Sequence, residues 1–167
     1  MTNRRHFITR MLGLLGLAGL AGKASPVEAA AENFEVAKSE AEWKKILTTA
    51  QFNVLRKEGT ERPYTSPLND EKRSGLFHCA GCDLPIYSSK TKYESGTGWP
   101  SFWAPLDNAV GTKIDRGFLM TRTEVHCRRC GGHLGHVFDD GPKPTGKRHC
   151  LNGVALKFEP GTGELSG

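Results

Sequence analysis

The segment after residue 38 predicts two short helices. Each begins with a hydroxyl residue that is followed three positions later by Glu or Gln, which is the capping-box pattern of a helix N-terminus. The capping pairs are Ser39 with Glu42 and Thr48 with Gln51, and the apolar residues that follow are Trp43, Ile46 and Leu47, then Phe52 and Leu55. Gly59 is the expected end of the second helix, because glycine readily adopts the conformation that closes a helix.

From Gly75 onward, short apolar runs separated by glycine and proline predict strands. The candidate strands are Leu76–His78, Leu84–Tyr87, Phe118–Val125, Leu134–Phe138 and Cys150–Phe158. The last run alternates most clearly, and a period of two places Arg148, Cys150 and Asn152 on one strand face. We therefore expect these three side chains to point into the same pocket. Few helices and many short strands indicate a compact antiparallel β-fold with a helical N-terminal extension.

Residues 1–31 have the pattern of an export signal. Residues 4–8 (RRHFI) resemble the twin-arginine motif, and the apolar stretch 11–22 is shorter than the about 20 residues that span a bilayer. Small residues near Ala29 and Ala31 fit a cleavage site. The alternative is a frayed basic terminus or an uncleaved anchor. The resemblance implies export of a folded protein by the twin-arginine machinery, and hence a periplasmic location.

The rest of the chain predicts one domain. A length of 167 residues fits a single domain, with residues 32–38 as a linker and residues 39–162 as the domain itself. The hydrophobic content of 37% is low for a globular domain. A metal would help such a chain to fold, because metal-binding energy is also folding energy.

Five cysteines divide into two Cys-x-x-Cys pairs and one single residue. The pairs are Cys79 with Cys82 and Cys127 with Cys130, and Cys150 stands alone. Four thiolates suit a tetrahedral zinc ion in a closed structural site, and the 44 residues between the pairs mean that the metal would join distant parts of the fold. Two disulfides are the alternative in an exported protein, although the spacing favours zinc. The neighbouring His78 and His126 are then expected to be supporting or surface residues rather than metal ligands.

The net charge argues against a nucleic-acid partner. Of the formal charge of +5, +3 lies in the first 29 residues, where four basic residues oppose one acidic residue. Zinc with four thiolates would offset the remaining +2 and leave the folded part near neutral. Binding to a phosphate backbone needs concentrated positive charge, and the sequence has no sustained basic stripe.

Cys150 is the candidate nucleophile. The thiolate is the reactive form, and nearby cations favour it; Arg148 lies two positions away on the same expected face. His133 and His136 are candidate proton donors, because imidazole titrates near neutrality. Regular strand geometry would send the two histidines to opposite faces, but Gly135 between them allows a bulge that re-aims one. The alternative for each histidine is a packed or surface residue.

The loop segment 96–103 (GTGWPSFW) presents two tryptophans between glycines and a proline. Aromatic side chains on such a loop can form an apolar cradle for a small group such as a methyl. Trp99 is the candidate for this role, whereas Trp103 is expected to plug the end of the barrel.

Together these motifs resemble the methionine-R-sulfoxide reductase B family, from about Glu40 to Pro160. The resemblance rests on the order and spacing of both cysteine pairs, residues 98–102 (GWPSF), residues 133–138 (HLGHVF) and residues 148–152 (RHCLN). It implies a mainly β fold of two antiparallel β-sheets, with short N-terminal helices and one structural zinc ion per chain.

The resemblance also implies roles for the site residues. Cys150 would attack the sulfur of the R epimer of methionine sulfoxide, free or in proteins, and would become a sulfenic acid. Trp99 would receive the substrate methyl group. The remaining pocket residues, which would handle the sulfoxide oxygen and its proton, are His133, His136, Arg148 and Asn152. In the periplasm this reaction would repair oxidised exported proteins.

One position departs from the family pattern. Thr97 occupies the place where many members carry a resolving cysteine. The sulfenic acid is therefore expected to be reduced directly by a thioredoxin-like protein or a small thiol. Two other hypotheses stay open, namely a zinc-stabilised binding module without catalysis and another thiol-dependent redox enzyme. Nothing in the sequence demands more than a monomer.

Overall fold

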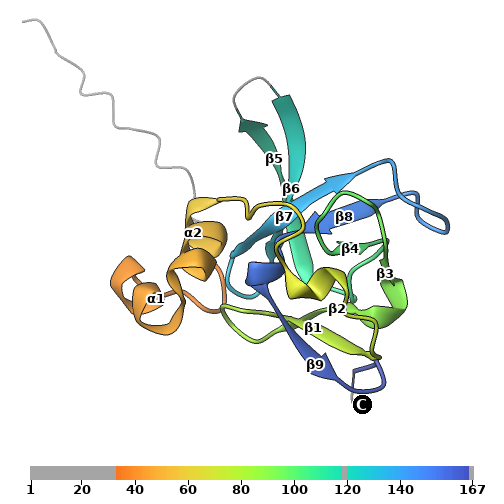
Figure 1. Cartoon of the computed structure of the whole chain (residues 1–167). Helices are drawn as coiled ribbons and strands as arrows, with labels where there is room; N and C mark the ends of the chain where they lie inside the picture. Colours follow the sequence, from red (N-terminus) through yellow and green to blue (C-terminus); the bar gives the residue numbers. More distant parts are fainter. Residues whose placement is uncertain (1–32, 118–119, 166–167) are drawn as a thin grey trace, which may run out of the picture. The chain divides into compact units, whose positions relative to one another are not determined.

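The structure is a computed structural model that describes residues 33–117 and 120–165 (Figure 1). Its elements are α1 (Glu40–Ile46), α2 (Thr49–Lys57), β1 (Gly75–Cys79), β2 (Pro85–Ser88), β3 (Lys92–Tyr93), β4 (Ser101–Phe102), β5 (Val110–Gly117), β6 (Met120–Cys127), β7 (His133–Phe138), β8 (Arg148–Leu151) and β9 (Leu156–Pro160), with 3₁₀ turns η1 (Pro67–Asn69), η2 (Ser89–Thr91) and η3 (Gly153–Ala155). The expected architecture of two antiparallel sheets and two short helices is confirmed. The expected export signal, residues 1–31, lies outside the described residues.

The strands form a three-stranded sheet in the order β2-β1-β9 and a six-stranded sheet in the order β3-β4-β8-β7-β6-β5. Figure 1 shows the two helices beside one end of the sheets, and the β5–β6 hairpin extending beyond the other strands. None of the helices within the described part of the chain is long and apolar enough to cross a membrane.

Both helices begin as the sequence predicts. The side chains of Ser39 and Thr48 accept hydrogen bonds from the backbone N–H three residues on. In each case the side chain of that third residue, Glu42 or Gln51, accepts a hydrogen bond from the backbone N–H of the capping residue. The helices bury Trp43, Phe52 and Leu55 against the sheets. α2 ends at Lys57, two residues before the expected glycine, because Glu58 itself takes the left-handed conformation with φ of 54° and caps the helix.

The predicted strand Cys150–Phe158 is wrong. β8 ends at Leu151, the turn η3 follows, and β9 belongs to the other sheet. The ladder with β7 continues for one more bond, in which the backbone N–H of Asn152 donates to Leu134 O at 2.8 Å. The chain then leaves the six-stranded sheet in a turn that the N–H of Ala155 closes on Asn152 O at 3.1 Å, with Gly153 against the Ser66 side chain, where a Cβ would not fit. The alternation in the sequence thus continues through a change of sheet. Arg148 and Cys150 share a strand, whereas Asn152 precedes the turn.

One cross-strand row of the six-stranded sheet is polar. Residues directly opposite in an antiparallel pair share a face of the sheet, and the register aligns Tyr93, Ser101, Cys150, His136, Glu124 and Lys113. The adjacent row carries Phe102 and His149, which are buried with Tyr87 in the core. The candidate nucleophile therefore lies on a row of titratable and hydroxyl side chains, on the face away from this core.

Buried His149 makes the stability of this core depend on pH. Burial lowers its pKa from 6.5 to about 4, and its Nδ1 lies 2.9 Å from Tyr87 Oη. The unfolded chain binds a proton near pH 6.5 that the folded chain does not, so the free energy of unfolding falls by about 3 kcal/mol between pH 6.5 and 4. We expect His149→Gln, which keeps a hydrogen-bonding partner for Tyr87, to lack this loss in urea unfolding across that range. Equal acid sensitivity in both proteins would contradict the assignment.

The segment expected to be a linker packs against the second cysteine pair. The backbone N–H of Val36 donates to Arg129 O at 2.9 Å, and the Phe34 ring meets His126 edge-on with centroids 5.8 Å apart. Glu35 lies 3.6 Å from the Arg129 guanidinium. Residues 34–36 thus contact the fold directly, just before α1 begins.

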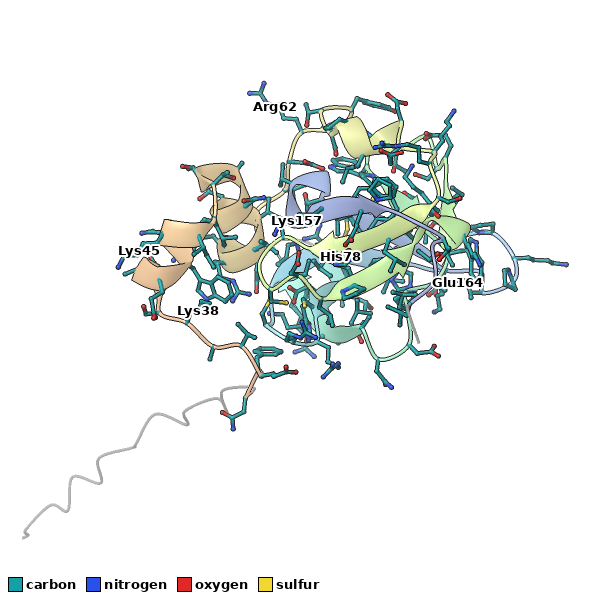
Figure 2. The ribbon with its side chains drawn as sticks, turned by 90° about the horizontal axis from the view of Figure 1, so that it is seen from below. Lys38, Lys45, Arg62, His78, Lys157 and Glu164 are labelled. Carbon is teal, nitrogen blue, oxygen red and sulfur yellow. The ribbon has the colours of Figure 1, made fainter. Side chains whose placement is uncertain are left out.

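Charged side chains are spread over the surface rather than gathered into one stripe. Figure 2 shows Lys45, Arg62 and Lys157 well apart from one another. Lys157 lies 3.4 Å from an Asp83 carboxylate oxygen. Each such exposed pair contributes little to stability.

Candidate functional site

Four cysteine side chains meet at the junction of the two sheets. The Sγ atoms of Cys79, Cys82, Cys127 and Cys130 all lie within 4.8 Å of one another. Cys79 Sγ is 3.7 Å from Cys130 Sγ, and Cys82 Sγ is 3.5 Å from Cys127 Sγ. A zinc ion with Zn–S bonds of about 2.3 Å needs tetrahedral edges of about 3.8 Å, whereas a disulfide needs about 2.05 Å. All five cysteines are free, and the four clustered sulfurs fit a closed tetrahedral metal site.

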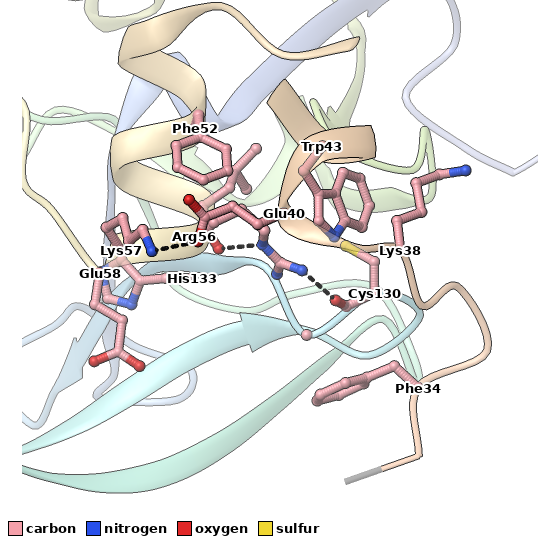
Figure 3. Close-up of a pocket in the computed structure, with 12 residues that line it drawn as sticks. Phe34, Lys38, Glu40, Trp43, Phe52, Arg56, Lys57, Glu58, Cys130 and His133 are labelled. Carbon is pink, nitrogen blue, oxygen red and sulfur yellow. Dashed lines mark hydrogen bonds and ion pairs between the residues drawn. The ribbon is translucent and has the colours of Figure 1, made fainter. Parts of the chain in front are cut away.

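Each pair lies in a tight turn that directs both sulfurs inward. The N–H of Asp83 donates to Cys79 O at 2.9 Å, and the N–H of Gly131 donates to Cys127 O at 2.8 Å. Figure 3 shows Arg56 reaching from α2 to the carbonyl oxygen of Cys130, at 3.1 Å. Hydrogen bonding with Cys127 raises the pKa of the Cys79 thiol well above its usual range. Four thiolates at this spacing therefore need a cation.

The fifth cysteine lies in a separate small cavity. The cavity has a volume of about 120 Å³ and is lined by Thr60, Trp99, Arg122, Gly135, His136, Phe138, Cys150, Leu151 and Asn152. Four of the residues singled out from the sequence, Trp99, His136, Cys150 and Asn152, are among them. The cavity thus places a half-buried thiol beside aromatic walls and two basic side chains, His136 and Arg122.

His136 is held by a carboxylate on the edge strand. Its Nε2 lies 2.8 Å from Asp115 Oδ2, which also accepts from Arg122 at 2.8 Å. The hydrogen bond from His136 lowers the pKa of Asp115, so the carboxylate is ionised and Nε2 carries the proton. Burial lowers the pKa of His136 despite this partner. His136 is therefore a neutral imidazole near pH 7 with Nδ1 as its free base.

His133 lies beside His136 but does not line the cavity. The two rings meet edge-on with centroids 5.3 Å apart. The expected bulge brings them together, since the register of β7 against β6 shifts between His133 and Gly135. A Cβ at Gly135 would lie 2.1 Å from Cys150 O, so only glycine fits there. The prediction that Gly135 allows a bulge between the two histidines is therefore confirmed.

Buried Glu124 fixes the orientation of His133. Glu124 Oε1 lies 2.6 Å from His133 Nδ1, and its other oxygen lies 2.9 Å from Lys113 Nζ. Burial opposes ionisation of Glu124, but these two partners lower its pKa overall. His133 Nδ1 therefore carries the proton. The ring also lines a second cavity of about 310 Å³, between α2 and the Cys130 turn (Figure 3).

Arg148 supports the cavity wall rather than lining it. Its guanidinium makes two hydrogen bonds of 2.8 Å to the Asp140 carboxylate and stacks 4.4 Å from the Phe138 ring centroid. Phe138 in turn lines the cavity. The positive charge stays near the candidate nucleophile, since Cys150 and Arg148 share β8.

Asn152 and Glu61 join three parts of the site. Asn152 Nδ2 donates to Leu134 O at 3.1 Å, and its Oδ1 accepts from the Glu61 N–H at 2.9 Å. Glu61 O accepts from Trp99 Nε1 at 3.1 Å, while the Glu61 carboxylate accepts from the N–H groups of Gly153 and Val154. Trp99 is thereby tied to the chain that follows Cys150.

Sequence reasoning missed one hydroxyl residue of the cavity wall and the charged partners of the site. The residues that it did not single out are Thr60, Glu61, Asp115, Arg122 and Glu124. The only signal available was the alternation of residues 120–127 (MTRTEVHC), which places Arg122, Glu124 and His126 on one face of a strand. Trp103, expected as a plug, is not among the residues that line the Cys150 cavity.

Comparisons with known proteins place both sites in one family. Residues 47–160, more than half of the chain, match the SelR domain. The chain is 54% identical to "Peptide methionine sulfoxide reductase MsrB" of Methanosarcina barkeri over 74% of this chain and 88% of that protein. The chain belongs to the MsrB family. It is also 48% identical to the MsrB of Hahella chejuensis, over 78% of this chain and 94% of that protein, and 51% identical to that of Leptospira interrogans, over 76% and 98%.

The matched range contains every residue of the metal centre and of the Cys150 cavity. It also contains Thr97, whose Oγ1 lies 3.7 Å from Cys150 Sγ. The MsrB resemblance drawn from the sequence motifs is therefore confirmed at the level of the family and of the fold.

Proposed function

We propose that this chain reduces the R epimer of methionine sulfoxide to methionine, with Cys150 as the nucleophile. The observation that carries the proposal is the cavity in which the Cys150 thiol, the Trp99 indole and neutral His136 come together. A volume of about 120 Å³ suits the methyl sulfoxide end of a side chain rather than a whole peptide. The names of the MsrB relatives support the same substrate class.

The reaction follows from what a sulfoxide needs. Its sulfur becomes electrophilic when its oxygen is protonated. His136 Nδ1 takes the thiol proton of Cys150, and the resulting imidazolium, paired with Asp115, gives a proton to the sulfoxide oxygen. The Cys150 thiolate then forms a bond to the substrate sulfur. The protonated oxygen moves from that sulfur to the Cys150 sulfur while the bond between the two sulfurs breaks, so methionine leaves as a thioether and Cys150 becomes a sulfenic acid. Two electrons pass from Cys150 to the substrate sulfur.

The shape of the site provides the reason for epimer selection. A sulfoxide sulfur carries a methyl group, an oxygen, the methylene of the side chain and a lone pair. A site that seats the methyl at Trp99 and the oxygen at His136 presents the sulfur of only one epimer to Cys150. The decisive experiment is turnover of each pure epimer of a methionine sulfoxide peptide with dithiothreitol, followed by chromatography. Consumption of both epimers at equal rates, or of neither, would overturn the proposal.

The acid side of the pH profile tests the role of His136. The ionised Asp115 carboxylate raises the pKa of His136 while burial lowers it, so Asp115→Asn lowers that pKa further. Because the neutral ring must accept the thiol proton, we expect the acid limb of kcat/KM to move to lower pH. The rate at the optimum should fall by about tenfold to a hundredfold, since the imidazolium loses its partner.

The matched control for this experiment is Asp139→Asn, which removes an exposed carboxylate paired with Lys147. It should leave the profile unchanged. An acid limb that stays in place in Asp115→Asn would mean that another group sets it.

We propose further that the four-cysteine centre holds Zn²⁺. The closed set of four sulfurs leaves no open position for substrate, so the metal would only stabilise the fold.

We also propose that residues 1–31 direct export to a bacterial periplasm, where the enzyme would repair oxidised exported proteins. A thioredoxin-like protein or small thiol there would supply two thiols, and would return Cys150 to the thiol with release of water. Fractionation that leaves the full-length precursor in the cytoplasm would refute the export proposal.

A further inference from the structure

A chain of three hydroxyl groups ends at the Cys150 sulfur. Thr97 Oγ1 lies 3.7 Å from Cys150 Sγ, Ser95 Oγ lies 2.8 Å from Thr97 Oγ1, and Ser101 Oγ lies 2.7 Å from Ser95 Oγ. Ser101, which is 1% exposed, also donates to Trp99 O at 3.1 Å. The mechanism above uses none of these three hydroxyls.

The backbone holds Thr97 firmly against the thiol. The flanking Gly96 and Gly98 have φ of 71° and 89°, values that favour glycine. Gly98 O accepts from the Tyr64 N–H at 2.7 Å and from Asn69 Nδ2 at 3.1 Å, while Gly96 O accepts from Tyr64 Oη at 2.7 Å. A Cβ at Gly98 would lie within 2.9 Å of the Tyr64 ring. The position of the Thr97 hydroxyl is therefore set by a built loop.

Each hydroxyl has a single proton to donate, so the chain has two directions. With a Cys150 thiol, the S–H donates to Thr97, and the bonds run through Ser95 and Ser101 to the Trp99 carbonyl. With a thiolate, each hydroxyl donates in the opposite direction. Ser101 then donates to Ser95 instead of the Trp99 carbonyl, Ser95 donates to Thr97, and Thr97 donates to the sulfur. The chain can therefore accept from the neutral sulfur and donate to the charged one without leaving the sulfur unpaired.

We propose that Thr97 is a catalytic residue whose hydroxyl donates a hydrogen bond to the Cys150 thiolate, and that Ser95 and Ser101 form the reversible chain that supplies this bond. The inference deepens the proposed reductase function and rests on it for the identity of the reaction. A hydrogen bond to the charged form of a group favours that form. The proposal gives the residue at the position of the family's resolving cysteine a role of its own.

The other titratable groups near Cys150 lie on strands rather than on the Thr97 loop, so we expect them to stay in place when Thr97 is changed. His136 and Arg122 line the cavity from β7 and β6, Arg148 approaches along β8, and Tyr93 lies on β3. Asp140 offsets the charge of Arg148 through its two hydrogen bonds. A change in Cys150 reactivity in a Thr97 variant therefore reports the hydroxyl.

The test is alkylation of Cys150 by iodoacetamide over a pH series, on the full metal-loaded chain, read by mass spectrometry of the Cys150 peptide. We expect Thr97→Val to slow alkylation near neutral pH by about tenfold and to move the reactivity curve to higher pH. Thr97→Ser keeps the hydroxyl and should stay close to the unmodified protein. Thr112→Val, at an exposed position on β5, is the control for the substitution itself.

A second variant, Ser95→Ala, tests the same chain of hydroxyls if Thr97→Val misfolds, because it leaves position 97 unchanged. It should shift the curve in the same direction by a smaller amount. Unchanged alkylation at every pH in both Thr97→Val and Ser95→Ala would overturn the inference. Alkylation does not require the substrate, so a protein that shows the expected shift but consumes no sulfoxide would refute the proposed function and leave the hydroxyl chain standing.

Discussion

Replacing Cys150 with serine is expected to abolish turnover of methionine-R-sulfoxide, with a loss on the order of a thousandfold or more. The serine hydroxyl is isosteric enough to keep the Thr97 contact and the strand pairing, so the fold should survive. It fails in this reaction because an alcohol is far less acidic and less nucleophilic than a thiol, and because its oxygen cannot take up the sulfoxide oxygen as sulfur does in a sulfenic acid. Steady-state assays of the pure epimer measure the loss directly.

A single-turnover experiment identifies where the oxygen goes. One equivalent of substrate without reductant should leave one oxygen atom on the Cys150 peptide of the unmodified protein, trapped as a sulfenic acid adduct. The Cys150→Ser variant should gain none while keeping its metal content and melting temperature. A disulfide between Cys150 and any of the four clustered cysteines after turnover would contradict the assignment of those cysteines to a metal.

Local signals in the sequence predicted the local structure well. The two capping boxes fixed the starts of α1 and α2, because each uses hydrogen bonds within four residues. The four metal-centre cysteines could be recognised because their chemistry demands close pairs, whatever lies between them. The bulge at Gly135 followed from a single glycine between two histidines, and the register of β6 against β7 confirms it.

The strand register and the carboxylate partners could not be predicted in the same way. His136 Nε2 lies 2.8 Å from Asp115 Oδ2 although the two residues are 21 positions apart in the sequence, and no local pattern around either residue indicates this pairing. The sequence of β5 is mostly polar and gives no strand pattern, because β5 is an edge strand with most of its side chains exposed. The change of sheet at Asn152 is equally hidden, since alternation continues through it. Partners that depend on which strands pair are set by tertiary structure rather than by propensity.

Removal of the metal should unfold the domain. Cys79 ends β1 of one sheet and Cys127 ends β6 of the other, so a metal bound there would join the two sheets across the 44 residues that separate the two cysteine pairs. Structural zinc contributes about 10–16 kcal/mol to the folding of small domains, which exceeds the about 5–15 kcal/mol by which a typical domain is stable. We expect chelation, or Cys82→Ala, to abolish the cooperative thermal transition seen by circular dichroism, and metal analysis to show loss of zinc.

The two sulfur populations make the control straightforward. Cys150→Ala removes a thiol of the same kind from a wall of the Cys150 cavity, and should keep both the metal and the transition. Cys82 is the half-buried member of the cluster, so Cys82→Ala leaves the least empty space in the core, and any large loss of stability reflects the metal rather than packing. A metal-free protein that melts at the same temperature as the zinc-loaded one, or that holds two disulfides, would show that the sheets are joined in another way.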